Sequence, residues 1–282
     1  MSTHEKMPAP KKAYGQNFII NPGICPKMVA QSGLDGSFGV VEIGPGLGAL
    51  TRELAAAARR VVAIEIDGEL IPKLQQETAD FDNIEIVHGD VMKLDLKELI
   101  NTRFGGMDVA VFGNLPYYIT SPIIMKLLEE KLPIKMVVAM VQREAAERLC
   151  AAPGSRETGA VSLAVRYYSR PHKLFDVAPG SFYPRPKVTS SVIKLDVLEQ
   201  PAACPCDKKR MFAIIKAAFS QRRKTAANSI SSGTDIDKAD IIKALVHIGV
   251  TEDIRPERLT IAQFAALSDF FTRRQEKETE KN

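Results

Sequence analysis

Val40-Val41-Glu42-Ile43-Gly44-Pro45-Gly46-Leu47-Gly48 is the stretch that decides the fold. Its first four residues are typical of a strand buried on both faces, and the glycine-rich turn after them opens a helix through Leu54 to Ala58. Glycines in a strand-to-helix turn allow the backbone to approach a ligand closely. The stretch therefore predicts a strand–turn–helix unit with a ligand-binding turn, although tight packing alone remains an alternative.

The alternation of strands and helices continues along the chain after the glycine-rich turn. Buried strands are predicted at 61–64, 84–87, 109–112 and 135–141, with helices between them. This order predicts an α/β fold with a mostly parallel sheet covered on both faces and joined by right-handed crossovers. Two later strands, 173–177 and 188–197, are expected to add a hairpin and make seven strands. The proline-rich segment between them, 179–186, is predicted to be neither helix nor strand.

The composition changes after the last predicted strand. Glu199-Gln200-Pro201 reads as a linker, and the chain beyond it is predicted to be helical at 208–219, near 225, at 238–248 and at 261–273. Three parts are therefore expected: a flexible tail at 1–13, an α/β domain at 14–198 and a small all-helical domain at 199–282.

The totals are those of a globular protein with a modest positive charge. The chain has 282 residues, a formal net charge of +4 and four cysteines, which have neither the spacing nor the nearby histidines of a metal site. Its longest apolar runs are too short to span a bilayer, and its first residues do not form a signal peptide. We therefore expect a cytoplasmic protein with reduced thiols, no metal and no membrane contact.

Acidic residues end the two strands that follow the glycine turn. Glu65 is positioned to accept the two hydroxyls of a ribose, and Asp90 to accept a hydrogen bond from an adenine amino group. A dinucleotide would require phosphate donors in place of a second carboxylate. Each acid alone is more often a helix cap or a solvated residue. Together, beside the glycine turn, they favour a pocket for an adenosine without a diphosphate.

The fourth predicted strand ends in Asn114-Leu115-Pro116-Tyr117. Pro116 cannot continue a central strand, so a polar amide and an aromatic ring are left at a strand's carboxyl end, where open α/β sheets bind their ligands. A loop with a buried tyrosine is the alternative that these four residues leave open.

Several motifs together resemble the S-adenosylmethionine-dependent ribosomal RNA adenine dimethyltransferases, in their bacterial small-subunit form. The resemblance covers nearly the whole chain. Its motifs, in chain order, are Gly15-Gln16-Asn17-Phe18, 41–48, Glu65-Ile66-Asp67, Gly89-Asp90, 114–117, 182–188 and Phe219-Ser220-Gln221-Arg222-Arg223-Lys224.

The resemblance implies a Rossmann-like methyltransferase domain and a set of site residues. S-adenosylmethionine is the implied cofactor. By the resemblance, Asn17 and Ile19 close over it, Gly44 lies along its methionine part, Glu65 holds the ribose and Asp90 the adenine, and Asn114 stands between cofactor and substrate.

The implied chemistry requires hydrogen-bond acceptors and no general base. An adenine N6 lone pair is delocalised into the ring, so the amino group is a poor nucleophile until it becomes tetrahedral. The Asn114 side-chain oxygen and the Leu115 carbonyl can accept its two hydrogens, with Pro116 setting the direction of that carbonyl. Tyr117 and Phe182 are expected to stack on the two faces of the target base.

A basic cluster at 207–224 is expected to contact RNA phosphates. Against the single acid Asp207 it has seven basic residues: Lys208, Lys209, Arg210, Lys216, Arg222, Arg223 and Lys224. A solvated helix face is the alternative, and Ala226-Ala227 departs from the family pattern beyond it. The expected partner is 16S rRNA in a small ribosomal subunit or its precursor, bound by a monomer.

Other activities are open to such a chain. A DNA adenine methyltransferase more often has a second proline where Leu115 stands. A large-subunit rRNA methyltransferase of the antibiotic-resistance type shares similar turns, but the segments 182–188 and 221–225 are nearer the small-subunit form. An assembly factor that acts by binding rRNA is the alternative from another functional class.

Overall fold

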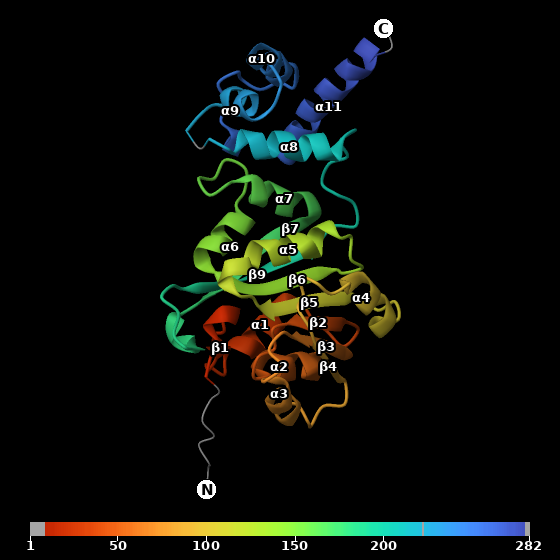
Figure 1. Ribbon diagram of the computed structural model, residues 1–282, viewed down its shortest axis with the longest axis vertical. Helices are drawn as coiled ribbons and strands as arrows, with labels where there is room; N and C mark the ends of the chain where they lie inside the picture. Colours follow the sequence, from red (N-terminus) through yellow and green to blue (C-terminus); the bar gives the residue numbers. More distant parts are fainter. Residues whose placement is uncertain (1–8, 222, 280–282) are drawn as a thin grey trace. The chain divides into compact units, whose positions relative to one another are not determined.

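The computed structural model describes residues 9–221 and 223–279, which fall into two compact units. The first unit holds residues 9–146 and 172–197, and the second holds the remaining described residues from 147–171 and from 198 onwards. Figure 1 follows the chain through both units.

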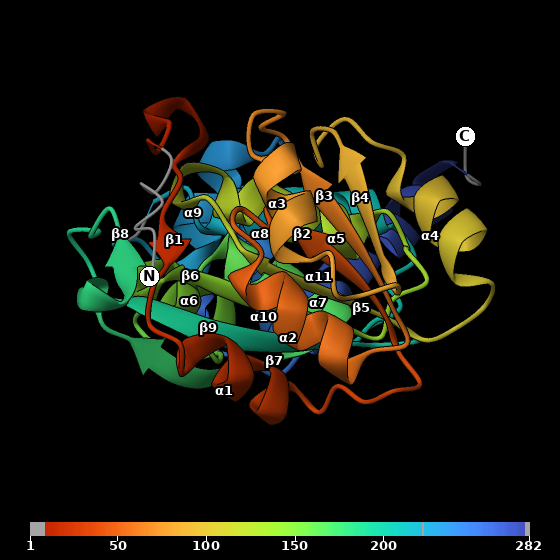
Figure 2. The ribbon, with the colours of Figure 1, turned by 90° about the horizontal axis from the view of Figure 1, so that it is seen from below.

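A seven-stranded sheet forms the first unit, in the order β4-β3-β2-β5-β6-β9-β7 (Figure 2). The pairs from β4 to β6 are parallel, and β9 is antiparallel to β6. The predicted α/β fold with a mostly parallel sheet and a late hairpin is thus confirmed. The strand bounds are β2 (Gly39–Ile43), β3 (Arg60–Glu65), β4 (Ile84–His88), β5 (Val109–Asn114), β6 (Met136–Gln142), β7 (Ser169–Val177) and β9 (Ser190–Val197).

Helices cover both faces of this sheet. Val40 packs in a core cluster with residues of α1 and α2, whereas its neighbour Gly39 faces the Phe104 ring of α4 so closely that a Cβ there would clash. Successive residues of a strand point to opposite faces, so these helices lie on opposite sides. The helix bounds are α1 (Ile24–Ser32), α2 (Ala49–Ala57), α3 (Ile71–Glu77), α4 (Leu96–Phe104) and α5 (Thr120–Glu129), with the short turns η1 (Lys12–Tyr14) and η2 (Tyr117–Ile119).

The strand register brings the predicted site residues to one edge of the sheet. Ile43 is aligned with Ile64 of β3 and with Gly113 of β5. The residues after these positions are the glycine turn, Glu65 and Asn114. Parallel strands thus place the turn, the acid and the amide side by side at their carboxyl ends.

A second, two-stranded sheet is one element that the sequence analysis does not predict. β1 (Phe18–Ile19) pairs antiparallel with β8 (Phe182–Tyr183), which lies within the segment 179–186, after the turn η3 (Pro179–Ser181). The expectation that this segment has no strand is therefore wrong. Two residues are too few to show an alternating pattern, and the pairing is with a segment far away in the sequence.

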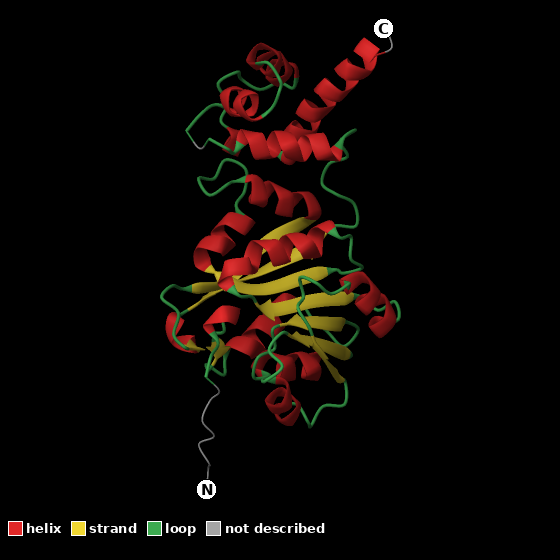
Figure 3. Cartoon of the chain, in the orientation of Figure 1, coloured by secondary structure: helices red, strands yellow, loops and turns green. Residues whose placement is uncertain are grey.

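The second unit is almost entirely helical (Figure 3). The centre of the Phe212 ring of α8 lies 5.2 Å from that of Tyr167 and 6.3 Å from that of Tyr168. Both tyrosines belong to α7, so these ring contacts join α7 to α8. No helix among the described residues is long and apolar enough to cross a membrane. The bounds are α6 (Arg143–Cys150), which begins in the first unit, α7 (Ala160–Tyr168), α8 (Lys208–Ala218), α9 (Ala226–Gly233), α10 (Lys238–His247), η4 (Pro256–Arg258) and α11 (Ile261–Thr279).

Candidate active site

The glycine turn after β2 has a backbone that only glycine adopts readily. Gly44, Gly46 and Gly48 have φ angles of 70°, 57° and 80°, in the left-handed region that is strained for other residues. A Cβ added to Gly44 would meet nothing within 4 Å, so the space beside this residue is open. The turn therefore presents bare backbone to an adjoining space, as a ligand-binding turn requires.

Glu65 lies at the end of β3 and is bonded to the glycine turn. Its Oε2 accepts a hydrogen bond from the Gly46 N–H at 3.0 Å, and its Oε1 accepts one from the Asp67 N–H at 2.9 Å. Burial raises the pKa of Glu65, and these two N–H groups act in the opposite direction. Each carboxylate oxygen has a second lone pair, so Glu65 can still accept hydroxyl groups while the backbone fixes its direction.

Asp90 follows β4 and is half-buried beside Glu65. The Gly89 N–H donates to the Glu65 carbonyl oxygen at 2.9 Å, which places the two acids at neighbouring strand ends. The Asp90 Oδ1 accepts from the Met92 N–H at 2.9 Å and so caps the turn that follows. The structure thus brings together the two acids that the sequence analysis assigns to an adenosine.

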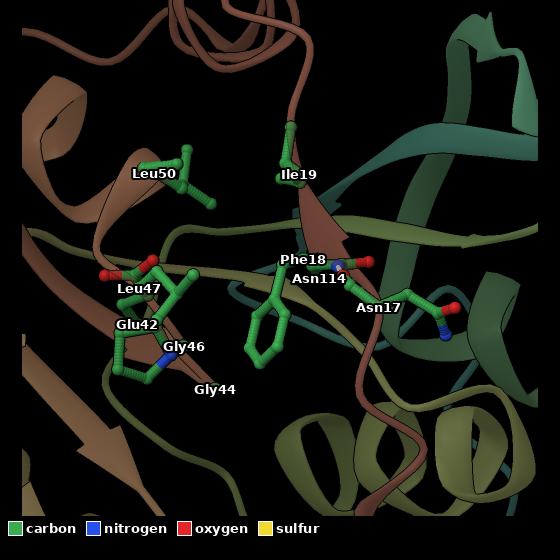
Figure 4. A pocket seen from close by; sticks show the side chains of 11 residues that line it. Asn17, Phe18, Ile19, Glu42, Gly44, Gly46, Leu47, Leu50 and Asn114 are labelled. Atoms are coloured by element: carbon green, nitrogen blue, oxygen red, sulfur yellow. Dashed lines mark hydrogen bonds between the residues drawn. The ribbon is translucent and has the colours of Figure 1, made fainter. Parts of the chain in front are cut away.

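A narrow cavity of about 40 Å³ lies between the glycine turn and β1 (Figure 4). A cavity of this size holds little more than water as it stands. Four predicted cofactor residues are brought together in its lining, which consists of Asn17, Phe18, Ile19, Glu42, Gly44, Pro45, Gly46, Leu47, Ala49, Leu50 and Asn114.

Asn114 is held in one orientation by Asn17, the residue before β1. Its Nδ2 donates to the backbone carbonyl of Asn17 at 2.8 Å. Its side-chain oxygen, on the other branch of the amide, is therefore directed away from that carbonyl. The amide of Asn17 itself is directed away from the glycine turn in Figure 4, and donates to the Gly15 carbonyl at 3.1 Å. In this structure Asn17 therefore contacts Asn114 through its backbone.

The three residues after Asn114 are each fixed by a separate contact. Leu115 is buried and its N–H donates to the Met140 carbonyl at 3.0 Å. The Pro116 carbonyl accepts from the Thr120 hydroxyl at 3.1 Å. The Tyr117 hydroxyl is bonded to that of Ser190 at 2.7 Å, and burial raises its pKa. The turn is thus bonded to three different elements, β6, α5 and β9.

Phe182 lies in the hydrophobic core cluster, and its side chain is 2% exposed. Its neighbour Tyr183 is 45% exposed. Stacking of Phe182 on a base, as the resemblance implies, requires the ring to become uncovered, and this role stays a prediction.

An N-terminal strap, residues 11–17, is fastened to Asp67, which the sequence analysis quotes in a motif but gives no role. Asp67 accepts hydrogen bonds from Lys11 Nζ at 2.8 Å and from Gln16 Nε2 at 3.0 Å. Its burial would raise the pKa, but these bonds outweigh it and hold the pKa below its usual range. Residues 1–8 of the predicted tail lie outside the described residues, and Lys11 near its end is also bonded to Glu69 at 2.9 Å.

Glu42 is a second residue whose place the sequence analysis does not recognise. It lines the cavity and is 1% exposed. In the sequence, its place could have been inferred from the run Val40 to Ile43, in which it is an acid among apolar residues that are predicted to be buried. Among the described residues there is no cluster of three or more metal-ligating side chains.

Comparisons with known proteins identify the family of this chain. The family model described as "Ribosomal RNA adenine dimethylase" matches residues 8–273. A Shouchella clausii protein named "Ribosomal RNA small subunit methyltransferase A" is 45% identical over 263 residues, 92% of this chain and 88% of the relative. The protein of the same name from Alkaliphilus metalliredigens is 44% identical over 94% of this chain and 92% of its own length.

Two solved structures are similar over nearly the whole chain. A dimethyladenosine transferase from Plasmodium falciparum has a TM-score of 0.76 and 26% identity, covering 92% of this chain and 98% of that one. The 23S rRNA methyltransferase ErmE has a TM-score of 0.68 and 25% identity, covering 90% and 98%. With a family model that matches most of its length and relatives above 40% identity, this chain belongs to the ribosomal RNA adenine dimethylase family.

Proposed function

We propose that this chain transfers methyl groups from S-adenosylmethionine to two adjacent adenosines near the 3′ end of 16S rRNA. Each adenosine receives two methyl groups on its N6 amino nitrogen. The observation that carries the proposal is the Asn114 amide, which is held at the strand end beside the two acids that we expect to bind an adenosine. The names of the relatives and the matching family model support the same activity.

The residues present fit the cofactor. The open space beside Gly44 is a cradle that a side chain would fill, and it adjoins the carboxylate of Glu65. In our proposal Glu65 holds the ribose, Asp90 the adenine amino group, and the backbone at Gly44 and Asn17 flanks the methionine part. When bound, S-adenosylmethionine supplies an electrophilic methyl group on a sulfonium sulfur.

Asn114 and Leu115 prepare the adenine for attack. The Asn114 side-chain oxygen and the Leu115 carbonyl accept the two N6 hydrogens and so draw the nitrogen lone pair out of conjugation. Tyr117 supports one face of the base, and its bond to Ser190 keeps the ring in place. After transfer, the substrate nitrogen loses a proton to water, because the mechanism gives no residue the role of a base.

A cleft in the second unit offers contacts for RNA phosphates. It encloses about 1010 Å³, and Arg223 of the basic cluster lies in its lining. Arg222 of that cluster is outside the described residues. The cleft adds arginines that the sequence analysis did not single out, and two acids accompany them; its charged lining residues are Arg148, Arg156, Arg223, Arg255, Arg258, Glu157 and Glu257.

The small subunit is favoured over the large one. The relatives at 41–45% identity have small-subunit names, whereas ErmE, named for 23S rRNA, is 25% identical. We further propose that the enzyme acts as a monomer in the cytoplasm, on a late precursor of the subunit.

The experiment that tests this function is methyl transfer from labelled S-adenosylmethionine to small-subunit particles, large-subunit particles and naked rRNA in parallel. We expect labelled N6,N6-dimethyladenosine from the small-subunit particles. Label in large-subunit adenosine alone would support the ErmE-like activity, and no labelled adenosine in any sample would overturn the proposal. If an Asn114→Ala variant that does not methylate still supported normal subunit assembly, rRNA binding rather than methylation would be the activity that selection maintains in this protein.

A further inference from the structure

The outer loop, residues 183–188, runs from the last residue of β8 towards β9 and has no role in the mechanism proposed above. Tyr183 and Val188 are each 45% exposed, so this one loop holds two of the six exposed large apolar side chains among the described residues. An aromatic ring with an open face and a polar tip is suited to a wet contact with a partner.

Both ends of the outer loop are fixed beside the candidate active site. At one end Tyr183 is the register partner of Phe18, which lines the cofactor cavity. At the other end the hydroxyl of Ser190, the first residue of β9, is bonded to the Tyr117 hydroxyl at 2.7 Å. The loop therefore lies next to the turn 114–117, which is expected to hold the target adenine.

The Tyr183 ring is on the outer side of the β1–β8 ribbon. Successive residues of a strand point to opposite faces. Phe182 is 2% exposed and lies in the core cluster, whereas Tyr183 is exposed and is not part of the cavity lining. A group that stacks on Tyr183 therefore stays outside the pocket that receives the cofactor.

Two cations follow this ring, and no acid offsets them nearby. Arg185 and Lys187 are both exposed, and neither forms an ion pair with another residue of the described chain. The sequence from 177 to 195 contains no acidic residue at all. Pro184 and Pro186 restrict the backbone beside the two cations, so holding them in place costs less conformational entropy.

An exposed ring followed by two unpaired cations matches the chemistry of single-stranded RNA. Bases stack on aromatic side chains, and Lys and Arg contact the phosphates between them. In the proposed reaction one adenine leaves its stack and enters the site at 114–117. The next nucleotide along the strand remains outside the pocket, on the side where the outer loop lies.

We propose that the outer loop binds the nucleotide next to the target adenosine. Tyr183 stacks on the base of this nucleotide, and Arg185 and Lys187 contact the phosphates that flank it. Of two adjacent adenosines, one then occupies the outer loop while the other is methylated. The inference rests on the function proposed above and adds to it a site for a second nucleotide.

The first test combines a change in the protein with a change in the RNA. The affinity for small-subunit particles is measured with S-adenosylhomocysteine present, on intact particles and on particles in which one or the other of the two adenosines lacks its base. Tyr183→Ala is expected to weaken binding to intact particles by roughly 5- to 150-fold. On at least one of the abasic particles it should have no further effect, because the stacking partner is already absent. Tyr183→Phe keeps the ring and should restore the affinity.

The second test concerns the phosphates. Arg185→Gln combined with Lys187→Gln is expected to lower the slope of log affinity against log salt concentration by about one for each charge. The matched control combines Lys97→Gln with Lys131→Gln, which removes two exposed cations elsewhere in the first unit. The slope of the control should equal that of the wild type.

The outcomes separate this inference from the proposed function. Equal losses from Tyr183→Ala on all three kinds of particle, or an unchanged affinity for intact particles, would overturn the role of Tyr183. Equal salt slopes for the two double variants would overturn the phosphate contacts. In each of these cases, methylation of intact particles by the wild-type protein leaves the proposed function standing. A wild-type protein that does not methylate them would overturn both.

Discussion

The side chain of Asn114 donates a hydrogen bond to the backbone carbonyl of Asn17 at 2.8 Å, across 97 positions of the sequence. The bond joins the end of a central strand to the segment that forms the outer wall of the cavity. It fixes which branch of the Asn114 amide presents oxygen. In the proposed mechanism, the acceptor for the substrate amino group is thus set before a substrate arrives.

Replacing Asn114 with alanine removes that acceptor. We expect the rate of methyl transfer to small-subunit particles to fall about a hundredfold or more, as losses of single preorganised polar groups do. The thermal midpoint should change little in comparison. Asn101→Ala, at an exposed position of α4, is the matched control and should retain full activity. Comparable activity in the two variants would contradict the role of Asn114.

Replacing Asp67 with asparagine loosens the strap. The change removes the charge that Lys11 and Gln16 contact, so the β1 wall should open more readily. We expect S-adenosylhomocysteine to dissociate about fivefold faster, or ~1 kcal/mol, in stopped-flow displacement. Glu69→Gln is a sharp control, because Glu69 is bonded to the same lysine but its side chain is 80% exposed. Equal dissociation rates in the two variants would show that the strap does not close the cavity.

Tyr117 tests whether ring stacking or the hydroxyl matters. Tyr117→Phe loses the bond to Ser190 and keeps the ring, so we expect most of the activity to remain. Tyr117→Ala loses the stacking face, worth about 1–3 kcal/mol per base, and should reduce kcat/KM for rRNA by roughly 5- to 150-fold. The affinity for S-adenosylmethionine, measured in parallel, should stay the same in both. If phenylalanine were as damaging as alanine, the hydroxyl would be the essential group.

Glu42 should also make the stability of the cofactor-free protein depend on pH. Its folded pKa of about 8 lies above the ordinary value of 4.5, so unfolding releases a proton between these values. The stability linked to the neutral acid is complete below pH 4.5 and is lost as the pH rises through about 8. Between pH 5 and pH 8, the thermal midpoint of the wild type should therefore fall relative to that of Glu42→Gln. Parallel pH profiles for the two proteins would contradict this.

The sequence predicts the sheet and most of the site because those features depend on local patterns. The runs 61–64 and 109–112 are apolar and lie between turn residues, so their burial and their ends can be expected. Glu65 and Asn114 then follow strand ends, and the parallel arrangement brings them together.

The features that were missed depend on contacts between distant residues. The helix α6 follows β6 directly, without a turn between them, and its eight residues give too short an apolar pattern to separate it from the strand. The β1–β8 pairing has only two residues on each side. The bonds of Lys11 and Gln16 to Asp67 span 56 and 51 positions and leave no local pattern. The lack of a hydrogen-bond partner for the buried Oε2 of Glu42 can be recognised only when the packing around it is known.

The pairing of β1 with β8 makes the two halves of the reaction depend on each other. Ile19 lines the cofactor cavity, and its register partner Phe182 belongs to the segment expected to hold the target base. If Ile19 moves outward to admit the cofactor, its pairing with Phe182 requires that residue to move as well. Occupancy of either site then changes the affinity of the other by the same factor, because linkage between two binding equilibria is reciprocal. We therefore expect this two-residue ribbon to link cofactor binding to RNA binding.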